Sequence, residues 1–311
     1  MRLVVTGASG FCGTAVARLA AARGHEVLCL GRRPGPVGRH VPWDAAGPAP
    51  GLDGADAVVH LAAAVGDPRP GRRVEREFRA VNVDGAARLL DAAAGLPVVW
   101  VSSASVYRPG PYPGPVREDH PADGQRGPYG RTKAAGERLA LAAGAVALRP
   151  RAVYGDGDRH LLPRLRRVVR GGRAWLPGPD VAMSLTAVEN LAAACLAALG
   201  WPGGAYNIAD DRPYSRDEVF ARVLGVPVRH VPAGLARAAA VVSPALTRYA
   251  VDQLTDGMVL DLGRARAQGY RPAGGLLGVD HGRAEDRGGV GAVAAAPDHD
   301  RVHREDVTGL A

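Results

Sequence analysis

The stretch TGASGFCG at residues 6–13 decides the expected fold of this chain. It follows a short apolar, β-branched run, Leu3–Thr6, which predicts a strand, and it leads into Thr14–Arg23, an alanine-rich segment with helical periodicity. Gly24 is the residue expected just after a helix end, and His25–Leu30 predicts the next strand. A strand, a glycine-rich turn, a helix and a second strand in this order predict a βαβ unit.

The glycines of this turn, Gly7, Gly10 and Gly13, have the spacing G-x-x-G-x-x-G. Between a strand and a helix, such glycines allow a tight turn and let a phosphate approach the backbone N–H groups at the positive end of the helix. A plain tight turn is the alternative, but the position of the glycines at the first βα junction favours a dinucleotide site. The residues expected to hold its pyrophosphate are Gly7, Ser9, Gly10, Phe11, Cys12 and Gly13.

The end of the second predicted strand, Leu30–Arg33, bears on the identity of the dinucleotide. An acidic residue about 20 positions beyond the glycines would bind the ribose 2′-hydroxyl of NAD, whereas arginine suits the 2′-phosphate of NADP. Arg32 and Arg33 stand there, and no acidic residue does. NADP is therefore favoured over NAD. NAD stays open, because arginine is also the general-purpose cation of this chain.

The next expected strand, Asp56–Ala63, is apolar and ends in small residues. Small side chains at the carboxyl end of a strand let a ligand approach the backbone, so we expect Leu61, Ala62 and Ala63 to line the cofactor site. His60, inside the strand, is expected to be a structural hydrogen-bonding residue rather than a catalyst.

Strands and helices continue to alternate as far as residue 149, which predicts a Rossmann-type, doubly wound parallel α/β sheet with helices on both faces. The loops then lengthen. We expect a dinucleotide-binding domain over 1–154, a smaller C-terminal substrate-binding region interleaved with the sheet edge over 155–273, and a poorly ordered tail over 274–311. The other expected elements are helix Arg79–Ala94 with Asn82, strand Val98–Ser102, a long loop and candidate lid Arg108–Pro128, helix Tyr129–Ala143, strand Ala145–Arg149, helices His160–Val169, Glu189–Leu199 and Ser215–Leu224 with Ser215 as N-cap, and an extended piece Tyr206–Ala209.

The composition is that of an ordinary globular protein, with 311 residues of which 47% are hydrophobic and 23% charged. The net charge of +8 comes from scattered arginines without a basic stripe or interleaved aromatic residues, which argues against nucleic-acid binding. No run reaches the roughly 18 apolar residues of a membrane span. Because no secretory signal precedes the first strand, a cytoplasmic location is expected.

No metal site is expected. Cys12, Cys29 and Cys195 lack the spacing of metal ligands and are expected to be small buried residues in a reducing compartment. His299 and His303 lie four residues apart among acidic residues, but a charged, solvated tail explains them better than a metal site does.

Lys133 is the only lysine among the 39 Lys and Arg residues of the chain. It lies four residues after Tyr129, so the two side chains share one face of the predicted helix. An ammonium is a compact charge with an adjustable pKa, and a guanidinium does not replace it where chemistry is involved. A surface pair on an amphipathic helix is the alternative, but one lysine kept in an arginine-rich chain favours a functional pair.

With these motifs, the chain resembles the extended short-chain dehydrogenase/reductase family, NAD(P)-dependent epimerase/dehydratase type, over about residues 1–273. Besides Y-x-x-x-K, the motifs T-G-x-x-G-F-x-G, H-L-A-A, N-V-x-G, S-S-x-x-V-Y and L-R-P-x-x-V-Y-G stand at Thr6–Gly13, His60–Ala63, Asn82–Gly85, Ser102–Tyr107 and Leu148–Gly155. The segments at 184–192, 206–208 and 260–272 are more loosely similar to the 3β-hydroxysteroid dehydrogenase-like branch.

The resemblance implies a role for each site residue. Tyr129 would exchange a proton with the substrate oxygen while a hydride passes to or from the nicotinamide, and Lys133 would favour the phenolate and bind the nicotinamide ribose. Ser103, four residues before the tyrosine of the V-Y pair, would hydrogen-bond the reacting oxygen; Ser102 and Ser105 are expected to be structural. The further cofactor contacts that the resemblance implies are Asn82, Pro150 and, through its backbone, Val153.

Three reactions share such a site. Dehydratases of the family carry an acidic pair directly after the catalytic Ser or Thr, and here Ala104 and Ser105 occupy those positions, so dehydration is not expected. Nucleotide-sugar epimerisation with a retained NAD(P) stays open, and interconversion of a secondary alcohol and a ketone is favoured. A non-catalytic dinucleotide sensor on the same fold is disfavoured, because the Ser, Tyr and Lys are all present.

The expected partner is a small-molecule substrate that the sequence does not identify. Dimers through the helices flanking the sheet are common in the family, so a homodimer is one of the expected states.

Overall fold

The computed structural model describes residues 1–66, 68, 71–158, 165–166, 168–242 and 248–276, with the backbone alone for 242, 248 and 249. The chain divides into two units, Met1–Leu277 and Gly278–Ala311, and the second lies outside the described residues. The tail expected over 274–311 is therefore described only at 274–276. His299 and His303 lie outside the described residues as well.

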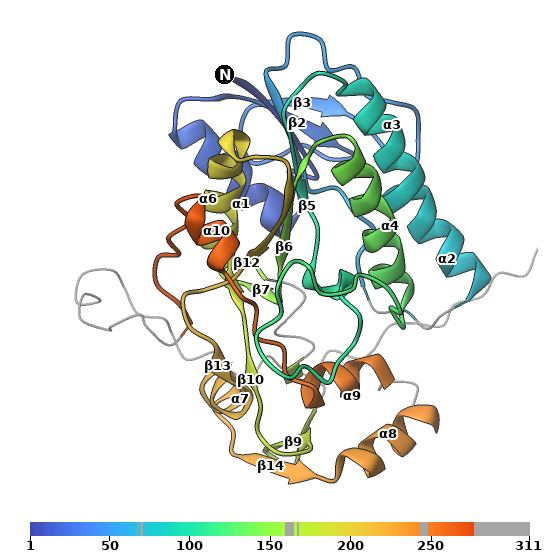
Figure 1. Ribbon diagram of the computed structural model, residues 1–311, viewed down its shortest axis with the longest axis vertical. Helices are drawn as coiled ribbons and strands as arrows, with labels where there is room; N and C mark the ends of the chain where they lie inside the picture. Colours follow the sequence, from blue (N-terminus) through green and yellow to red (C-terminus); the bar gives the residue numbers. More distant parts are fainter. Residues whose placement is uncertain (67, 69–70, 159–164, 167, 243–247, 277–311) are drawn as a thin grey trace, which may run out of the picture. The chain divides into compact units, whose positions relative to one another are not determined.

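A seven-stranded sheet with the order β12-β6-β5-β4-β1-β2-β3 forms the centre of the first unit, and all of its neighbouring strands are parallel (Figure 1). The expected doubly wound parallel sheet is confirmed. The strand order reverses between β1 and β4, and ligands of such sheets bind at the carboxyl edge at that point. The strands are β1 (Arg2–Thr6), β2 (Glu26–Gly31), β3 (Arg39–Pro42), β4 (Ala57–His60), β5 (Val98–Val101), β6 (Val146–Pro150) and β12 (Gly204–Ile208).

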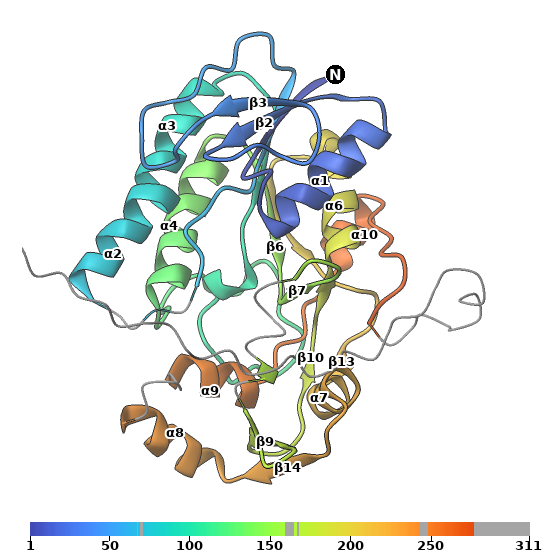
Figure 2. The same ribbon diagram turned by 180° about the vertical axis from the view of Figure 1, so that it is seen from behind.

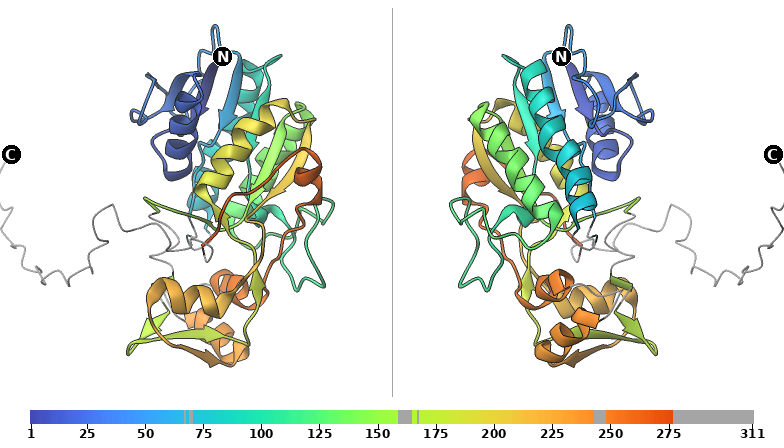
Figure 3. Two further views of the ribbon diagram at one scale, coloured as in Figure 1. Left: turned by 90° about the vertical axis from the view of Figure 1, so that its left-hand side faces the viewer. Right: turned by 90° about the vertical axis from the view of Figure 1, so that its right-hand side faces the viewer.

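Helices cover both faces of this sheet (Figures 1 and 2). On one face α1 packs beside α6, and on the other α4 packs beside α2 and α3, as the side views also show (Figure 3). Many contacts use alanine, such as Ala17 on the first face and Ala86 and Ala140 against Trp100 on the second. Small side chains let helices approach the sheet closely. The helices are α1 (Phe11–Ala22), α2 (Arg72–Arg79), α3 (Gly85–Ala92), α4 (Pro128–Ala142) and α6 (Val188–Ala197).

The helix that the sequence places at Arg79 begins earlier, at Arg72. Arg73 and Glu77 form an ion pair at 2.8 Å one turn apart, which supports a helix in this strongly charged segment. A π-helical stretch, Ala80–Asp84, then connects α2 to α3.

Three further segments differ from their sequence-based predictions or lie partly outside the described residues. The connection expected over Gly35–Leu52 contains the edge strand β3, which pairs with β2. The extended piece expected at Tyr206–Ala209 belongs to the main sheet as β12, because it pairs in parallel with β6. The sheet thus continues beyond residue 154, and the domain boundary there stays a prediction. The helix expected over His160–Val169 lies largely outside the described residues, and Val169 itself belongs to β8.

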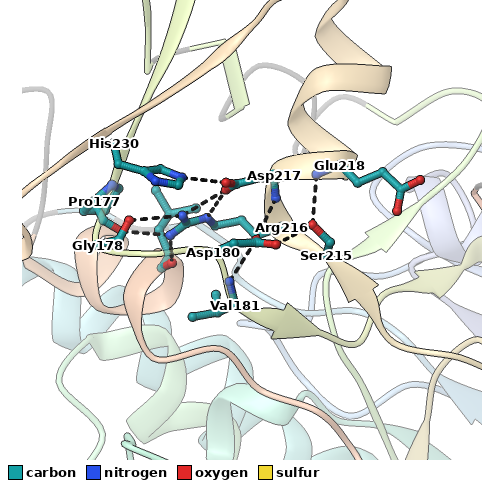
Figure 4. Close-up of polar contacts among 10 residues, drawn as sticks. Pro177, Gly178, Asp180, Val181, Ser215, Arg216, Asp217, Glu218 and His230 are labelled. Atoms are coloured by element: carbon teal, nitrogen blue, oxygen red, sulfur yellow. Dashed lines mark hydrogen bonds and ion pairs between the residues drawn. The ribbon is translucent and has the colours of Figure 1, made fainter.

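A smaller group of elements surrounds Arg216, which is fully buried (Figure 4). The expected N-cap is confirmed, because Ser215 Oγ accepts the Glu218 N–H at 3.1 Å. In the sheets of this group, β9 lies between β14 and β8, and β10 pairs with β13. Its elements are β8 (Val169–Arg170), β9 (Arg173–Pro177), β10 (Ala182–Met183), β13 (Tyr214–Ser215), α7 (Arg216–Leu224), β14 (Val228–Val231), α8 (Ala233–Val242) and α9 (Arg248–Thr255).

Three further elements contact the main sheet or α6. Strand β7 (Val153–Tyr154) pairs with β11 (Thr186–Ala187) beside α6, and α10 (Gly263–Ala267) contacts β12.

The loop expected as a lid, Arg108–Pro128, is anchored along its length. Val116 forms a parallel bridge with Leu260, and its carbonyl accepts a hydrogen bond from Asn207 Nδ2 at 2.8 Å. Near its end, Arg126 forms an ion pair with the buried Asp252. Movement of the whole loop would break these contacts, so only shorter parts of it are free to act as a lid.

Candidate active site

The glycine-rich turn lies at the carboxyl end of β1. Gly7 has φ +67°, and a Cβ there would lie 2.9 Å from the Ala62 nitrogen. A Cβ at Gly13 would lie 2.2 Å from the Gly7 carbonyl oxygen. Within this described turn, helix α1 begins at Phe11 with no side-chain cap on its first N–H groups and no acidic residue in its first turn. The bare backbone and its N–H donors suit an anion such as a pyrophosphate.

Thr6 fixes the adjacent end of β4. Its Oγ1 accepts the N–H groups of Leu61 and Ala62 at 3.0 Å each and bonds to His60 Nδ1 at 2.9 Å. His60 stacks on Trp100 with 4.4 Å between ring centroids, and burial lowers the pKa of His60 to about 3. The structural role expected for His60 is confirmed. Thr6 was not singled out as a site residue, although it is the first residue of the glycine motif.

Arg32 and Arg33 follow the end of β2 and are exposed. Their guanidinium groups make no hydrogen bond or ion pair with the described part of the chain. Both cations are therefore available to a ligand at this edge.

Lys133 is buried on the inner face of α4, with 3% of its surface exposed. Its Nζ donates to the Val101 carbonyl oxygen, at the end of β5, over 2.7 Å, and lies 5.2 Å from the centroid of the Trp100 ring. Burial lowers the pKa of Lys133 to about 8, against the opposing effect of the Glu137 carboxylate. The alternative of a surface pair is excluded for this residue.

Tyr129 and Ser103 come from two segments that pack together. Tyr129 is half-buried in the first turn of α4. Ser103 follows β5, two residues after Val101, and its Oγ accepts the Ser105 N–H at 3.2 Å. Gly130 approaches this turn so closely that a Cβ would lie 2.8 Å from the Ser105 carbonyl oxygen. The start of α4 and the turn after β5 therefore meet beside the Lys133 ammonium.

The polar residues around this junction have different surroundings. Asn82 is buried: its Oδ1 accepts the Ala64 N–H at 2.8 Å, and its Nδ2 donates to Thr132 Oγ1 at 3.0 Å. Its amide therefore fixes the chain after β4 and the start of α4.

The hydroxyls of Ser102 and Ser105 have no hydrogen-bond partner among the described residues, so no hydrogen bond supports a structural role for them.

The segment after β6 is held in an unusual conformation. Pro150 ends β6, and Ala152 has φ +45°, a left-handed conformation that is uncommon for a residue with a side chain. Thr186 holds this turn, because its Oγ1 accepts the Arg151 N–H at 3.1 Å and its backbone pairs with Val153. The backbone of Val153 is thereby fixed near the carboxyl edge of the sheet.

A cleft lies beside the turn after β5. Ser105, Gly127 and Arg126 line it from the turn after β5 and the loop before α4, and Gln253 and Met258 line it from α9 and the segment that follows. The cleft lies between the turn after β5, the start of α4, the loop 108–128 and α9. The sequence does not indicate the residues on the α9 side, because nothing in it relates residues near 253 to those near 105.

A parallel sheet with a bare glycine turn at its switch point is the arrangement of a Rossmann-type, dinucleotide-binding protein. Helix α4, which carries Tyr129 and Lys133, is bonded through Lys133 to the end of β5. The profile of the NAD dependent epimerase/dehydratase family matches residues 3–209. The chain belongs to this family, within the extended short-chain dehydrogenase/reductases.

The chain is similar in sequence to two curated relatives and in structure to a solved protein. A 2-alkyl-3-oxoalkanoate reductase of Stenotrophomonas maltophilia is 32% identical over 260 residues, 72% of this chain and 75% of the relative. A 3 beta-hydroxysteroid dehydrogenase/Delta 5-->4-isomerase of Mycobacterium tuberculosis is 33% identical over 252 residues, 71% and 68% of the two chains. The structure of MoeE5 in complex with UDP-glucose and NAD is 28% identical, with a TM-score of 0.70 and 89% and 95% of the chains covered.

In the part of the chain that the structure describes, no helix is long and apolar enough to cross a membrane. Nor do the described residues contain a cluster of three or more His, Cys, Asp or Glu side chains suited to a metal ion.

Proposed function

We propose that this protein is an NADP(H)-dependent oxidoreductase that interconverts a ketone and a secondary alcohol. One observation carries the proposal: the only lysine of the chain is buried one helical turn after Tyr129, and its Nζ is hydrogen-bonded at 2.7 Å to the strand end that precedes Ser103. A phenol with a buried ammonium one helical turn away and a hydroxyl at the adjoining strand end suits general acid–base chemistry on a carbonyl oxygen.

In this proposal each residue has a distinct task. The Ser103 hydroxyl donates a hydrogen bond to the substrate oxygen, and the Tyr129 phenol donates its proton to that oxygen during reduction. The Lys133 ammonium stabilises the phenolate that remains, because a nearby positive charge favours the charged form of a phenol. The bound nicotinamide supplies the hydride.

The chain offers a site that suits the cofactor. The pyrophosphate would lie on the N–H groups of the turn at Gly7–Gly13, whose glycines leave the backbone bare. Arg32 and Arg33 would bind the 2′-phosphate of NADP, since both are exposed and make no ion pair with the described residues. The predicted contacts at Leu61–Ala63, Asn82, Pro150 and Val153 stay part of the proposal.

Two kinds of observation favour oxidoreduction over the other reactions. The two curated relatives above are named for a ketone reductase and for a hydroxysteroid dehydrogenase, each of which handles an alcohol or ketone. Dehydration lacks its acidic pair, because Ala104 and Ser105 follow Ser103. Nucleotide-sugar epimerisation is the second candidate, since the structure of MoeE5 holds UDP-glucose and NAD.

The test is an assay of NADPH and NADH oxidation with a panel of 2-alkyl-3-oxo acids and ketosteroids, alongside analysis of nucleotide bound to the purified protein. Turnover of a ketone with exchangeable NADPH is expected. Tightly retained nucleotide together with epimerisation of a UDP-sugar would contradict oxidoreduction and support the second candidate.

A further inference from the structure

A buried ion pair lies one helical turn beyond Lys133. Glu137 on α4 and Arg149 on β6 have side chains that are 3% and 5% exposed. Arg149 Nη2 donates to Glu137 Oε1 at 2.6 Å, and its Nε lies 3.1 Å from Oε2. This two-point geometry is that of a strong charge-assisted pair, which holds the carboxylate in one place.

Glu137 shares its helix face with the predicted catalytic pair. Tyr129, Lys133 and Glu137 follow one another at intervals of four residues, so their side chains lie one above the other on α4. The three residues form a row along α4, and Arg149 pairs with the last of them, Glu137. Within this row the carboxylate, rather than the guanidinium, raises the pKa of Lys133, although burial lowers it more.

The other groups that face the ammonium do not supply a negative charge. From β5 come the Val101 carbonyl oxygen and the ring of Trp100. From β4 comes His60, which is buried and neutral, because burial lowers its pKa to about 3. Tyr129 on α4 is the predicted proton donor itself. Among the described residues, the buried carboxylate that shares the helix face of Lys133 is therefore that of Glu137, and it favours the charged ammonium.

We propose that Glu137 is a positioning residue whose carboxylate, fixed in place by Arg149, keeps the buried Lys133 ammonium charged beside Tyr129. The use of that charge by Tyr129 rests on the proposed function, whereas its maintenance by Glu137 does not.

Arg149 has further contacts that keep the pair in register. Its Nη1 donates to the Glu118 carbonyl oxygen at 2.9 Å, and its guanidinium lies over the Tyr107 ring, 4.7 Å from the centroid. Glu118 Oε1 in turn accepts the Asn207 N–H at 2.8 Å. The loop 108–128 and β12 thus hold the guanidinium, and the guanidinium holds the carboxylate.

Since Lys133 is the only lysine, its titration can be observed directly. Protein grown with lysine isotopically labelled at Cε gives a single side-chain NMR signal, whose chemical shift follows protonation. The wild type should titrate with a midpoint at about pH 8. In Glu137→Gln, the midpoint should fall by about one pH unit, because the buried carboxylate one helical turn away no longer favours the charged form of the ammonium.

Two variants separate the charge effect from a loss of structure. Glu137→Gln leaves the Arg149 cation without its partner, which endangers folding. The double variant Glu137→Gln with Arg149→Met removes both charges and should still titrate below the wild type. The control is Glu75→Gln, which breaks an ion pair with Arg131 on a more exposed side of α4 and should leave the midpoint unchanged.

Each outcome decides the proposal. Wild-type midpoints in the folded single or double variant would reduce the Glu137–Arg149 pair to a structural role. If neither variant folds, a neutral Lys133 amine near neutral pH in the wild type would still contradict the proposal. A shifted midpoint in a protein without ketone turnover would uphold the role of Glu137 while the proposed function fails.

Discussion

Lys133 and Arg216 are both buried cations, and they are held in opposite ways. Arg216 is 0% exposed, and its guanidinium donates to the carbonyl oxygens of Pro177 at 2.8 Å and Leu254 at 2.6 Å, and to Asp217 Oδ1 at 2.9 Å (Figure 4). Lys133 is nearly as buried, at 3% exposed, but within the described part of the chain its ammonium donates a single hydrogen bond, to Val101.

The number of hydrogen bonds that each cation donates indicates its role. A planar guanidinium with five donors suits the joining of several fixed acceptors, so Arg216 ties β9, α7 and α9 together. An ammonium has three donors, and one that donates only once inside the protein keeps two for a ligand. Arg216, whose donors are all bonded to protein acceptors, maintains structure. Lys133, which has donors left for a ligand, lies near Tyr129 and Ser103 in the predicted catalytic site.

The largest expected effect is on the neighbour of Lys133. Tyr129→Phe removes the proposed proton donor and should lower kcat by a factor of roughly 100 to 10,000, with NADPH affinity nearly unchanged. Steady-state turnover and a fluorescence titration with NADPH measure the two quantities. Tyr206→Phe, which removes the buried hydroxyl bonded to Pro202, is the matched control and should keep its turnover. Unimpaired turnover of Tyr129→Phe would remove the catalytic assignment.

Replacing Lys133 by arginine tests whether the kind of cation at this buried position matters. Lys133→Arg keeps the charge but introduces a rigid, larger group into a packed site, and kcat should fall by about 100-fold. Stability measured by urea denaturation shows whether the loss reflects unfolding. Turnover at the wild-type level would mean that any buried cation suffices there.

The reverse exchange tests the structural cation. Arg216→Lys cannot reach all of the acceptors, and the carbonyl groups left unsatisfied should cost about 2–3 kcal/mol of unfolding free energy. Turnover per folded molecule should stay near that of the wild type. Arg212→Lys, at an exposed position in the same region, is the control and should cost almost nothing. Equal stabilities of the two variants would show that the contacts of Arg216 do not support the fold.

Arg32 and Arg33 differ from the two buried cations because both are exposed. Replacing both with serine should weaken NADPH binding by about tenfold, the loss of roughly one charge-assisted contact, and leave NADH binding unchanged. Fluorescence titrations with both nucleotides measure this, with Arg39→Ser as the control in the neighbouring strand β3. Tighter binding of NADH than of NADPH by the wild type would overturn the NADP preference.

The smallest expected effect is on the pH dependence of stability. Folded Lys133 loses its proton at about pH 8, whereas an unfolded lysine keeps it up to 10.5. Between these values the unfolded state binds more protons, so the stability of the wild type should rise with pH relative to Lys133→Met, by about 1 kcal/mol between roughly pH 8.5 and 9.5. Urea denaturation at both pH values measures this difference. A constant difference would mean that burial does not depress the pKa of Lys133.

Sequence patterns predicted what depends on neighbours along the chain. The turn at 6–13, the N-cap at Ser215 and the structural His60 follow from local spacing, and the structure confirms their geometry. The parallel sheet follows from the alternation of strands and helices. The place of β12 in the main sheet could not be predicted in this way. Its short segment pairs with β6, more than 50 residues earlier, and nothing local distinguishes it from a strand of the smaller region.

The sequence by itself determined the chemistry that is present: a phosphate turn, two arginines where a ribose would bind, and a single lysine four residues after a tyrosine. Only the tertiary structure decided the surroundings of these groups. Burial of Lys133, the pairing of Glu137 with Arg149 and the five hydrogen bonds of the Arg216 guanidinium arise from segments that meet only in the fold. The reason is physical, because desolvation and Coulomb interaction depend on distance in space rather than on distance along the chain.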